Sequence, residues 1–135
     1  MSAQTPFDQL LQAAAEQPEP QRLLFVFANA ELPDDATADQ RERFERGQGG
    51  TLTPAMCVDK APGELSGFAA LIAESRRAGP PWQVVFAAGL SGSNGQAPTE
   101  AQVDKAMEAL VERVRTGQLN GLMALNEAGE ALEFG

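Results

Sequence analysis

The sequence lacks histidine and tyrosine altogether, and Cys57 is its only cysteine. A lone cysteine excludes an intramolecular disulfide and a CxxC redox pair, and the zinc sites built on histidine or paired cysteines are excluded with them. Serine–histidine–aspartate and cysteine–histidine nucleophile systems are excluded because their general base is missing. An enzyme would have to work through a carboxylate or a lysine. The balance favours a protein that is not an enzyme, and we expect no catalytic residue, metal or cofactor.

Positive charge is also scarce. Ten Lys and Arg stand against nineteen Asp and Glu, which gives a net charge of −9. Phosphate backbones and anionic membranes recruit basic side chains, so neither nucleic acid nor a membrane is expected as a partner. The apolar runs are too short to span a bilayer, and the polar, acidic residues 1–10 do not resemble a signal peptide. We expect a cytoplasmic protein.

Apolar residues are plentiful enough for one core. The 135 residues are 43% hydrophobic, which is typical of a single globular domain covering residues 1–135. Apolar residues at helical spacing and helix-capping signals predict three helices and one short polar helix, in which Phe44 is expected to hold the helix to the body. The predicted helices cover residues 5–17, 63–79 and 99–117, with the polar one inside 33–50. The predicted strands cover residues 22–30, 51–60, 82–90, 121–125 and 130–134.

The strand patterns predict how the sheet is built. Residues 22–30 and 82–90 are apolar on both alternating faces, as in central strands of a covered sheet. Pro54 cannot donate to a ladder, so its strand lies at an edge or carries a bulge. Strands and helices alternate over residues 51–126, which favours parallel crossovers. We expect an α/β domain with a mixed, mostly parallel sheet of about five strands, helices packed on it and a C-terminal antiparallel hairpin; an α+β fold is the alternative.

The loop at 89–99 is the segment most typical of a ligand site. It joins a predicted strand to a predicted helix, and glycine lets backbone amides approach a ligand while a helix N-terminus favours anions. The candidate ligand-binding residues are Gly89, Ser91, Gly92, Ser93, Gly95 and Thr99. Their spacing is neither that of the dinucleotide fingerprint nor that of the P-loop. A plain connection between strand and helix explains the same residues.

Cys57 and Asp59 form a second candidate, a reactive thiol beside a carboxylate on one face of a strand. Lys60 points to the opposite face and no histidine is available, so a buried cysteine acting as a small apolar residue is the alternative. Asp34, Asp35 and Asp39 lack the calcium-loop pattern, and no metal site is predicted there. Trp82 is either an anchor for a protein partner or, as favoured, a core residue.

Several stretches resemble a known family. They are residues 21–71, the segment WQVVFAAGLSG and the segment GLMALNEAGEALEF, with the motifs LPDD, LTP, MCVDK and LSG. From about Phe7 to Phe134 the chain is similar to a family of small bacterial proteins that often carry the label "ribonucleotide reductase subunit alpha". The true large subunit is several times longer and needs a radical cysteine and a redox pair. Cys57 alone excludes that catalysis, and we interpret the label as a propagated error.

Two functions from different classes remain open. The favoured one is a non-catalytic protein-binding or accessory module whose partner is another protein, because no convergent set of polar residues is evident. The alternative is a small-anion or nucleotide-binding protein that uses the loop at 89–99, with the link to ribonucleotide reductase that the family label implies. A homodimer is a further option, paired through the Pro54 strand or the terminal hairpin.

Overall fold

The computed structural model describes residues 5–31, 35–45 and 51–132. Its helices are α1 (Pro6–Ala15), α2 (Ala38–Glu45), the 3-10 helix η1 (Pro62–Glu64), α3 (Phe68–Ala78) and α4 (Glu100–Thr116). Its strands are β1 (Gln21–Glu31), β2 (Thr51–Lys60), β3 (Val84–Ser91) and β4 (Met123–Asn126). No helix in these ranges is both long and apolar enough to cross a membrane.

The four strands form one antiparallel sheet in the order β2-β1-β3-β4. The expected α/β fold with a mostly parallel, five-stranded sheet is therefore wrong, and the fold is mixed α+β. Strands β2 and β3 do run parallel to one another, because each is antiparallel to β1. The chain passes from β2 through α3 to β3, but β1 lies between the two strands, so no parallel pair forms.

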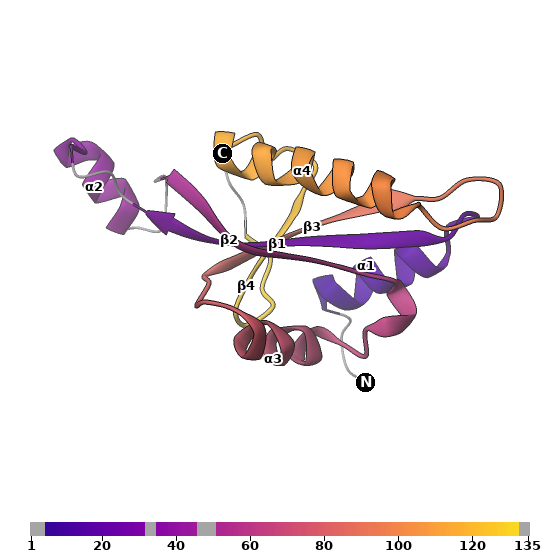
Figure 1. Ribbon diagram of the computed structural model, residues 1–135. Helices are drawn as coiled ribbons and strands as arrows, with labels where there is room; N and C mark the ends of the chain where they lie inside the picture. Colours follow the sequence, from indigo (N-terminus) through magenta and orange to yellow (C-terminus); the bar gives the residue numbers. More distant parts are fainter. Residues whose placement is uncertain (1–4, 32–34, 46–50, 133–135) are drawn as a thin grey trace.

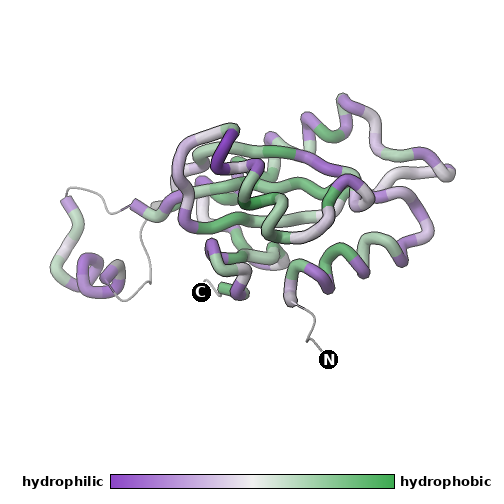
Figure 2. The backbone as a smooth tube through the Cα atoms, turned by 90° about the horizontal axis from the view of Figure 1, so that it is seen from below, coloured by the Kyte–Doolittle hydropathy of each residue, from purple (hydrophilic) through white to green (hydrophobic). Residues whose placement is uncertain are grey.

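The sheet is covered on both faces (Figure 1): α1 and α3 lie below it and α4 lies above it. The predicted two-faced burial of β1 is confirmed, since its alternate residues enter separate cores. The core on the side of α1 and α3 includes Phe7, Leu23, Phe25, Phe27, Leu71, Trp82 and Val85. The core on the side of α4 includes Leu24, Val26, Ala28, Phe86, Val103, Leu110 and Val114. Figure 2 shows these hydrophobic strands at the centre of the molecule.

The helix ends follow their capping signals in two of the three long helices. Thr5 caps α1 by accepting from the Asp8 amide, and Thr99 caps α4 in the same way from the Gln102 amide. Gly117 ends α4 in the left-handed conformation that glycine adopts at low cost. The third helix differs from the prediction: residues 62–64 form a separate 3-10 turn, and α3 begins only at Phe68.

Strand β2 lies at the edge of the sheet and carries a bulge near Pro54, as the proline predicts. Beyond the bulge, β1 and β2 continue past β3 as a two-stranded arm. Residues 29–31 pair with 51–53 of β2 but with no residue of β3. Helix α2 stands at the far end of this arm (Figure 1), and its described side chains are exposed. The expected anchoring contact of Phe44 concerns a side chain outside the described residues.

The C-terminal hairpin is shorter than expected. The Asn126 carbonyl accepts from the Gly129 amide in a tight turn, and the returning chain makes one isolated bridge, between Leu125 and Ala131. No second strand forms within the described residues, and 133 and 134 lie beyond them.

Trp82 belongs to the core, as favoured from the sequence. It is 3% exposed, and its ring packs against Phe27 with centroids 4.9 Å apart. Its indole N–H donates to the buried Ser75 hydroxyl at 2.8 Å. Since the indole is enclosed and its donor is satisfied, Trp82 is not an exposed anchor.

Candidate functional site

The glycine-containing loop folds into a tight β-turn. Ser93 and Gln96 exchange two backbone hydrogen bonds of 3.0 and 2.9 Å. Between them Asn94 and Gly95 have φ values of 54° and 77°. Positive φ at both central residues is typical of the type I′ turn of a two-residue hairpin, which an Asn-Gly pair favours. The sequence contained this signal, and both interpretations of the segment, as a ligand loop and as a plain connection, missed it.

The amides of this turn already donate to acceptors of the same chain. Gly92 donates to the Pro20 carbonyl at 2.8 Å, and Gly95 donates to the Glu19 carboxylate at 2.8 Å. A Cβ on Gly92 would lie 1.9 Å from the Gln96 carbonyl oxygen, so glycine is needed here for the hairpin itself. The amides that an anion would use are therefore engaged, one of them by a carboxylate.

The remaining loop candidates have structural partners of their own. Gly89 is an exposed residue of β3. The Ser91 hydroxyl accepts from the Gln21 side-chain amide at 2.7 Å. The Thr99 hydroxyl caps α4. The fold thus brings Gly92, Ser93 and Gly95 together in the turn, while the other three candidates lie in the flanking strand and at the start of the flanking helix.

Beside the turn lies a cleft of about 430 Å³. It is bounded by the C-terminal end of α1, the segment 17–20, the start of β1, the start of η1 and the turn. Its walls are mostly small and apolar, including Ala14, Pro18, Pro20, Ala61, Pro62 and Ala97. Gly95 is the one sequence-derived candidate among its lining residues. The cleft therefore adjoins the predicted loop but is built mainly by segments that the sequence analysis did not single out.

Charged groups gather at this cleft. Arg22 is a lining residue, and its guanidinium binds Asp59 at 2.6 Å and Glu64 at 3.1 Å. Asp59, a candidate from the sequence, thus serves as an ion-pair partner rather than as a neighbour of a reactive thiol. Glu19 also lines the cleft, is half-buried, and has no cation partner among the described residues. Two carboxylates therefore balance the positive charge of Arg22, whereas no cation of the described residues balances the negative charge of Glu19.

Cys57 is exposed rather than buried, so it does not act as a small core residue. Its pairing partner on β1 is Val26, which belongs to the core on the side of α4. Lys60 faces the other side, where it binds Glu74 of α3 at 2.7 Å. The expectation that Lys60 points away from Cys57 is confirmed, and no cation of β2 is available to activate the thiol.

The direction of the β1 backbone can be derived from its bonds to the β3 side. The Ala28 carbonyl accepts from the Gln83 amide at 3.0 Å, and Gln83 directly precedes β3. In an antiparallel ladder the N–H and C=O of one residue point to the same side, and the side alternates along the strand. Val26 and Leu24, two and four residues before Ala28, therefore also direct their backbone groups toward β3.

The same alternation gives the direction of the β2 backbone. Val26 lies opposite Cys57, and Leu24 lies opposite Asp59. The backbone groups of Val26 and Leu24 point toward β3, so they make no hydrogen bonds to β2. The two pairs are therefore of the non-hydrogen-bonded kind, in which the N–H and C=O groups of both partners point away from each other. The N–H and C=O groups of Cys57 and Asp59 consequently point outward along the edge of β2, beside which no further strand lies among the described residues.

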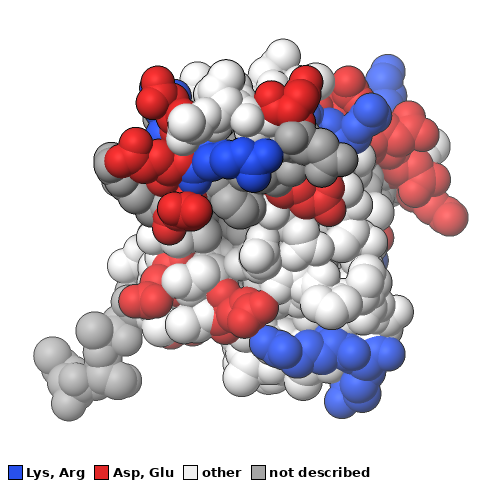
Figure 3. All heavy atoms as spheres, turned by 90° about the vertical axis from the view of Figure 1, so that its left-hand side faces the viewer, with Lys and Arg blue, Asp and Glu red and all other residues white. Residues whose placement is uncertain are grey.

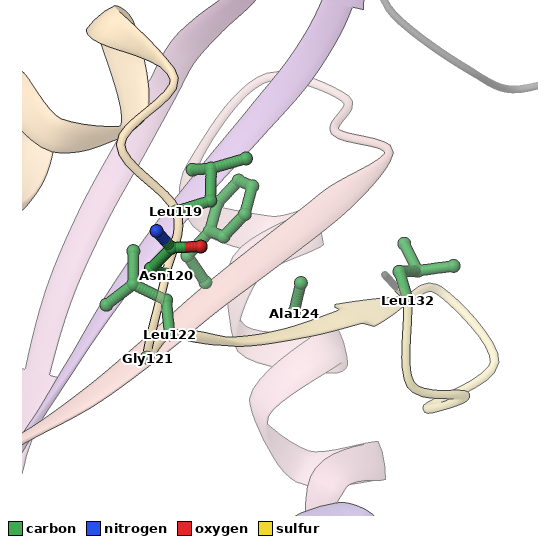
Figure 4. A pocket seen from close by; sticks show the side chains of 7 residues that line it. Leu119, Asn120, Gly121, Leu122, Ala124 and Leu132 are labelled. Atoms are coloured by element: carbon green, nitrogen blue, oxygen red, sulfur yellow. The ribbon is translucent and has the colours of Figure 1, made fainter. Parts of the chain in front are cut away.

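A second cavity, of about 300 Å³, lies against β3 and β4 on the α4 side (Figure 4). Leu119, Leu122 and Leu132 line it together with Phe86, and Asn120 supplies a polar side chain. Its other lining side chains are apolar, and no charged side chain lines it. It offers no group suited to catalysis.

Within the described residues no group of three or more metal-ligating side chains converges. Asp35 and Asp39 are exposed, and Asp34 lies outside the described ranges. Comparison of the chain with protein-family models, curated proteins and solved structures found no match.

Proposed function

We propose that this protein is a cytoplasmic, non-catalytic protein-binding module that pairs an extended segment of its partner with the open edge of β2. The single observation that carries the proposal is the outward direction of the Cys57 and Asp59 backbone groups on an edge strand of ten residues. Unpaired strand edges recruit extended chains, because each added residue pair satisfies backbone donors and acceptors on both sides.

The part of β2 nearest the body is well suited to such pairing. Edge strands are usually protected by proline, bulges or charge, and in β2 the proline and the bulge lie toward the arm, at residues 54 and 55. Residues 56–60 run without interruption, with Asp59 held by Arg22 and Lys60 held by Glu74. A partner strand would meet a fixed backbone and little unpaired charge.

The surface charge supports a protein partner. Figure 3, which views the end that carries α2, shows basic side chains in separate groups among acidic ones rather than one basic surface. With a net charge of −9, a phosphate-rich partner is disfavoured. Pairing through backbone groups does not depend on this charge. The family label makes ribonucleotide reductase one partner to look for.

The test separates the backbone of residue 57 from its side chain. Cys57→Pro removes the outward N–H at an edge position where proline is tolerated, whereas Cys57→Thr removes only the thiol. Tagged wild type and both variants are used to capture partners from the cytosol of the native host. We expect one near-stoichiometric protein with wild type and with Cys57→Thr, and its loss with Cys57→Pro.

Two further readouts complete this test. Thermal unfolding of Cys57→Pro must stay close to wild type, which shows that the sheet is intact. Light scattering shows whether the partner is a second copy of the chain, in which case wild type is a dimer and Cys57→Pro a monomer. Equal capture by the two variants would overturn the edge-pairing proposal, and loss with both would assign the binding to the thiol.

A further inference from the structure

We infer that the cleft beside Arg22 receives a lysine or arginine side chain from the segment that pairs with β2. This inference rests on the proposed function, because the segment must first lie along the β2 edge. It adds a specificity for one kind of side chain at one end of that segment.

The cleft begins where β2 ends. Ala61 and Pro62, which line it, directly follow Lys60, the last residue of β2. An extended chain advances about 3.3 Å per residue, so a strand paired beside Asp59 reaches the cleft within one or two further residues. Glu19 and Arg22 lie on the β1 side of Ala61 and Pro62, so only a long side chain at that point of the partner can reach past these two residues into the cleft.

The shape of the cleft suits a long, narrow aliphatic stem. Its volume of about 430 Å³ is bounded mainly by alanine and proline, whose side chains are apolar and carry no hydrogen-bond donors. Lysine and arginine bury their methylene stems against such walls and keep the charged group near polar atoms. An apolar side chain would fit the walls but would leave the Glu19 carboxylate without a counterion.

The charges around the cleft favour a cation. Glu19 has no basic partner among the described residues, and its Oε2 accepts only the Gly95 amide at 2.8 Å. The cleft also meets the C-terminal end of α1, the negative end of the helix dipole, and the last turn of α1 holds no basic residue. An anion would find only Arg22, whose charge Asp59 and Glu64 already offset.

The test uses a displayed library of random peptides, long enough to cover β2, selected on the wild-type protein. We expect the selected peptides to share a lysine or arginine at one position. One synthetic peptide is then titrated against wild type and the variants. Glu19→Gln keeps an oxygen for the Gly95 amide but removes the negative charge. We expect this variant to bind the peptide about five-fold more weakly than wild type, as for the loss of a partly exposed ion pair.

Matched variants keep the outcomes apart. Glu108→Gln, an exposed residue of α4 that does not line the cleft, changes the net charge equally and should leave the affinity unchanged. The cleft inference would be overturned if the selected peptides share no lysine or arginine, or if a peptide binds the Glu19→Gln and Glu108→Gln variants equally well. If those peptides still depend on the N–H removed in Cys57→Pro, the edge proposal stands. If basic peptides require Glu19 but bind the Cys57→Pro variant as well as wild type, the edge proposal is overturned, and with it the part of the inference that places the basic residue on a segment paired with β2. A selection that yields no binding peptide would overturn both proposals.

Discussion

The substitution Gly92→Ala discriminates between a structural hairpin and a ligand loop at residues 89–99. The added Cβ would lie 1.9 Å from the Gln96 carbonyl oxygen and 3.0 Å from the Ala97 Cα. Both are backbone atoms, so no side-chain rotation relieves the clash and the turn has to open. We expect a loss of stability that does not depend on any ligand.

The expected magnitude follows from the bonds that the turn supports. Three backbone hydrogen bonds converge there: the two between Ser93 and Gln96, and the one from Gly92 to Pro20. Each contributes about 1 kcal/mol net. If opening the turn breaks two of them, the loss is about 2 kcal/mol, and the reduced entropy of the unfolded alanine variant offsets about 0.5 kcal/mol of it. We expect Gly92→Ala to lower the free energy of unfolding by about 1.5 kcal/mol.

Gly89→Ala, in the part of the predicted loop that belongs to β3, is the matched control. The nearest atom to its Cβ is the Gln21 Oε1 at 3.5 Å, an ordinary contact, so the change should stay within about 0.5 kcal/mol. Urea unfolding is followed by the fluorescence of Trp82, the only tryptophan, which is 3% exposed in the folded protein. Equal stabilities of the two variants would refute the structural role of Gly92 and return the loop to the ligand candidates.

Two other predictions concern the core and the engaged amides. Ser75→Ala removes the acceptor of the buried Trp82 N–H, which costs about 2 kcal/mol, and gains about 0.5 kcal/mol of helix propensity, so urea unfolding should show a net loss of about 1.5 kcal/mol. Ser66→Ala, at an exposed position, is the control, and an equal effect there would contradict the reasoning. Millimolar inorganic phosphate should leave the melting temperature unchanged, because the amides of Gly92 and Gly95 already donate within the chain. A rise that Gly95→Val abolishes would instead support the anion-binding alternative.

The local features of the fold were predictable because short-range physics determines them. Alternating apolar residues in β1 indicated burial on both faces, and Pro54 indicated an edge or a bulge. The caps at Thr5 and Thr99 need only residues three positions further along the chain. Each of these signals lies within one element, where sequence spacing converts directly into geometry.

The topology was not predictable in this way. Alternation of strand and helix over residues 51–126 indicates that the chain crosses the sheet, but it does not say which strand lies between the ends of the crossover. Here β1 occupies the place between β2 and β3, so a helix-linked pair of parallel strands is separated by an antiparallel one. The position of β1 between β2 and β3 is decided by contacts between segments far apart in the sequence, which spacing within one element does not reveal.

The candidate residues were assessed by their side chains, whereas the feature that carries the proposed function lies in their backbone. Period-two spacing correctly placed Cys57 and Asp59 on one face of β2, but it cannot say whether their amides point inward or outward. That direction depends on β1 directing Ala28 toward Gln83, a bond between segments more than fifty residues apart. It follows that side-chain changes at residue 57 should be nearly silent and that a change to its N–H should not be. The candidate thiol and the candidate binding edge thus share a residue, but a substitution that spares the N–H affects only the thiol.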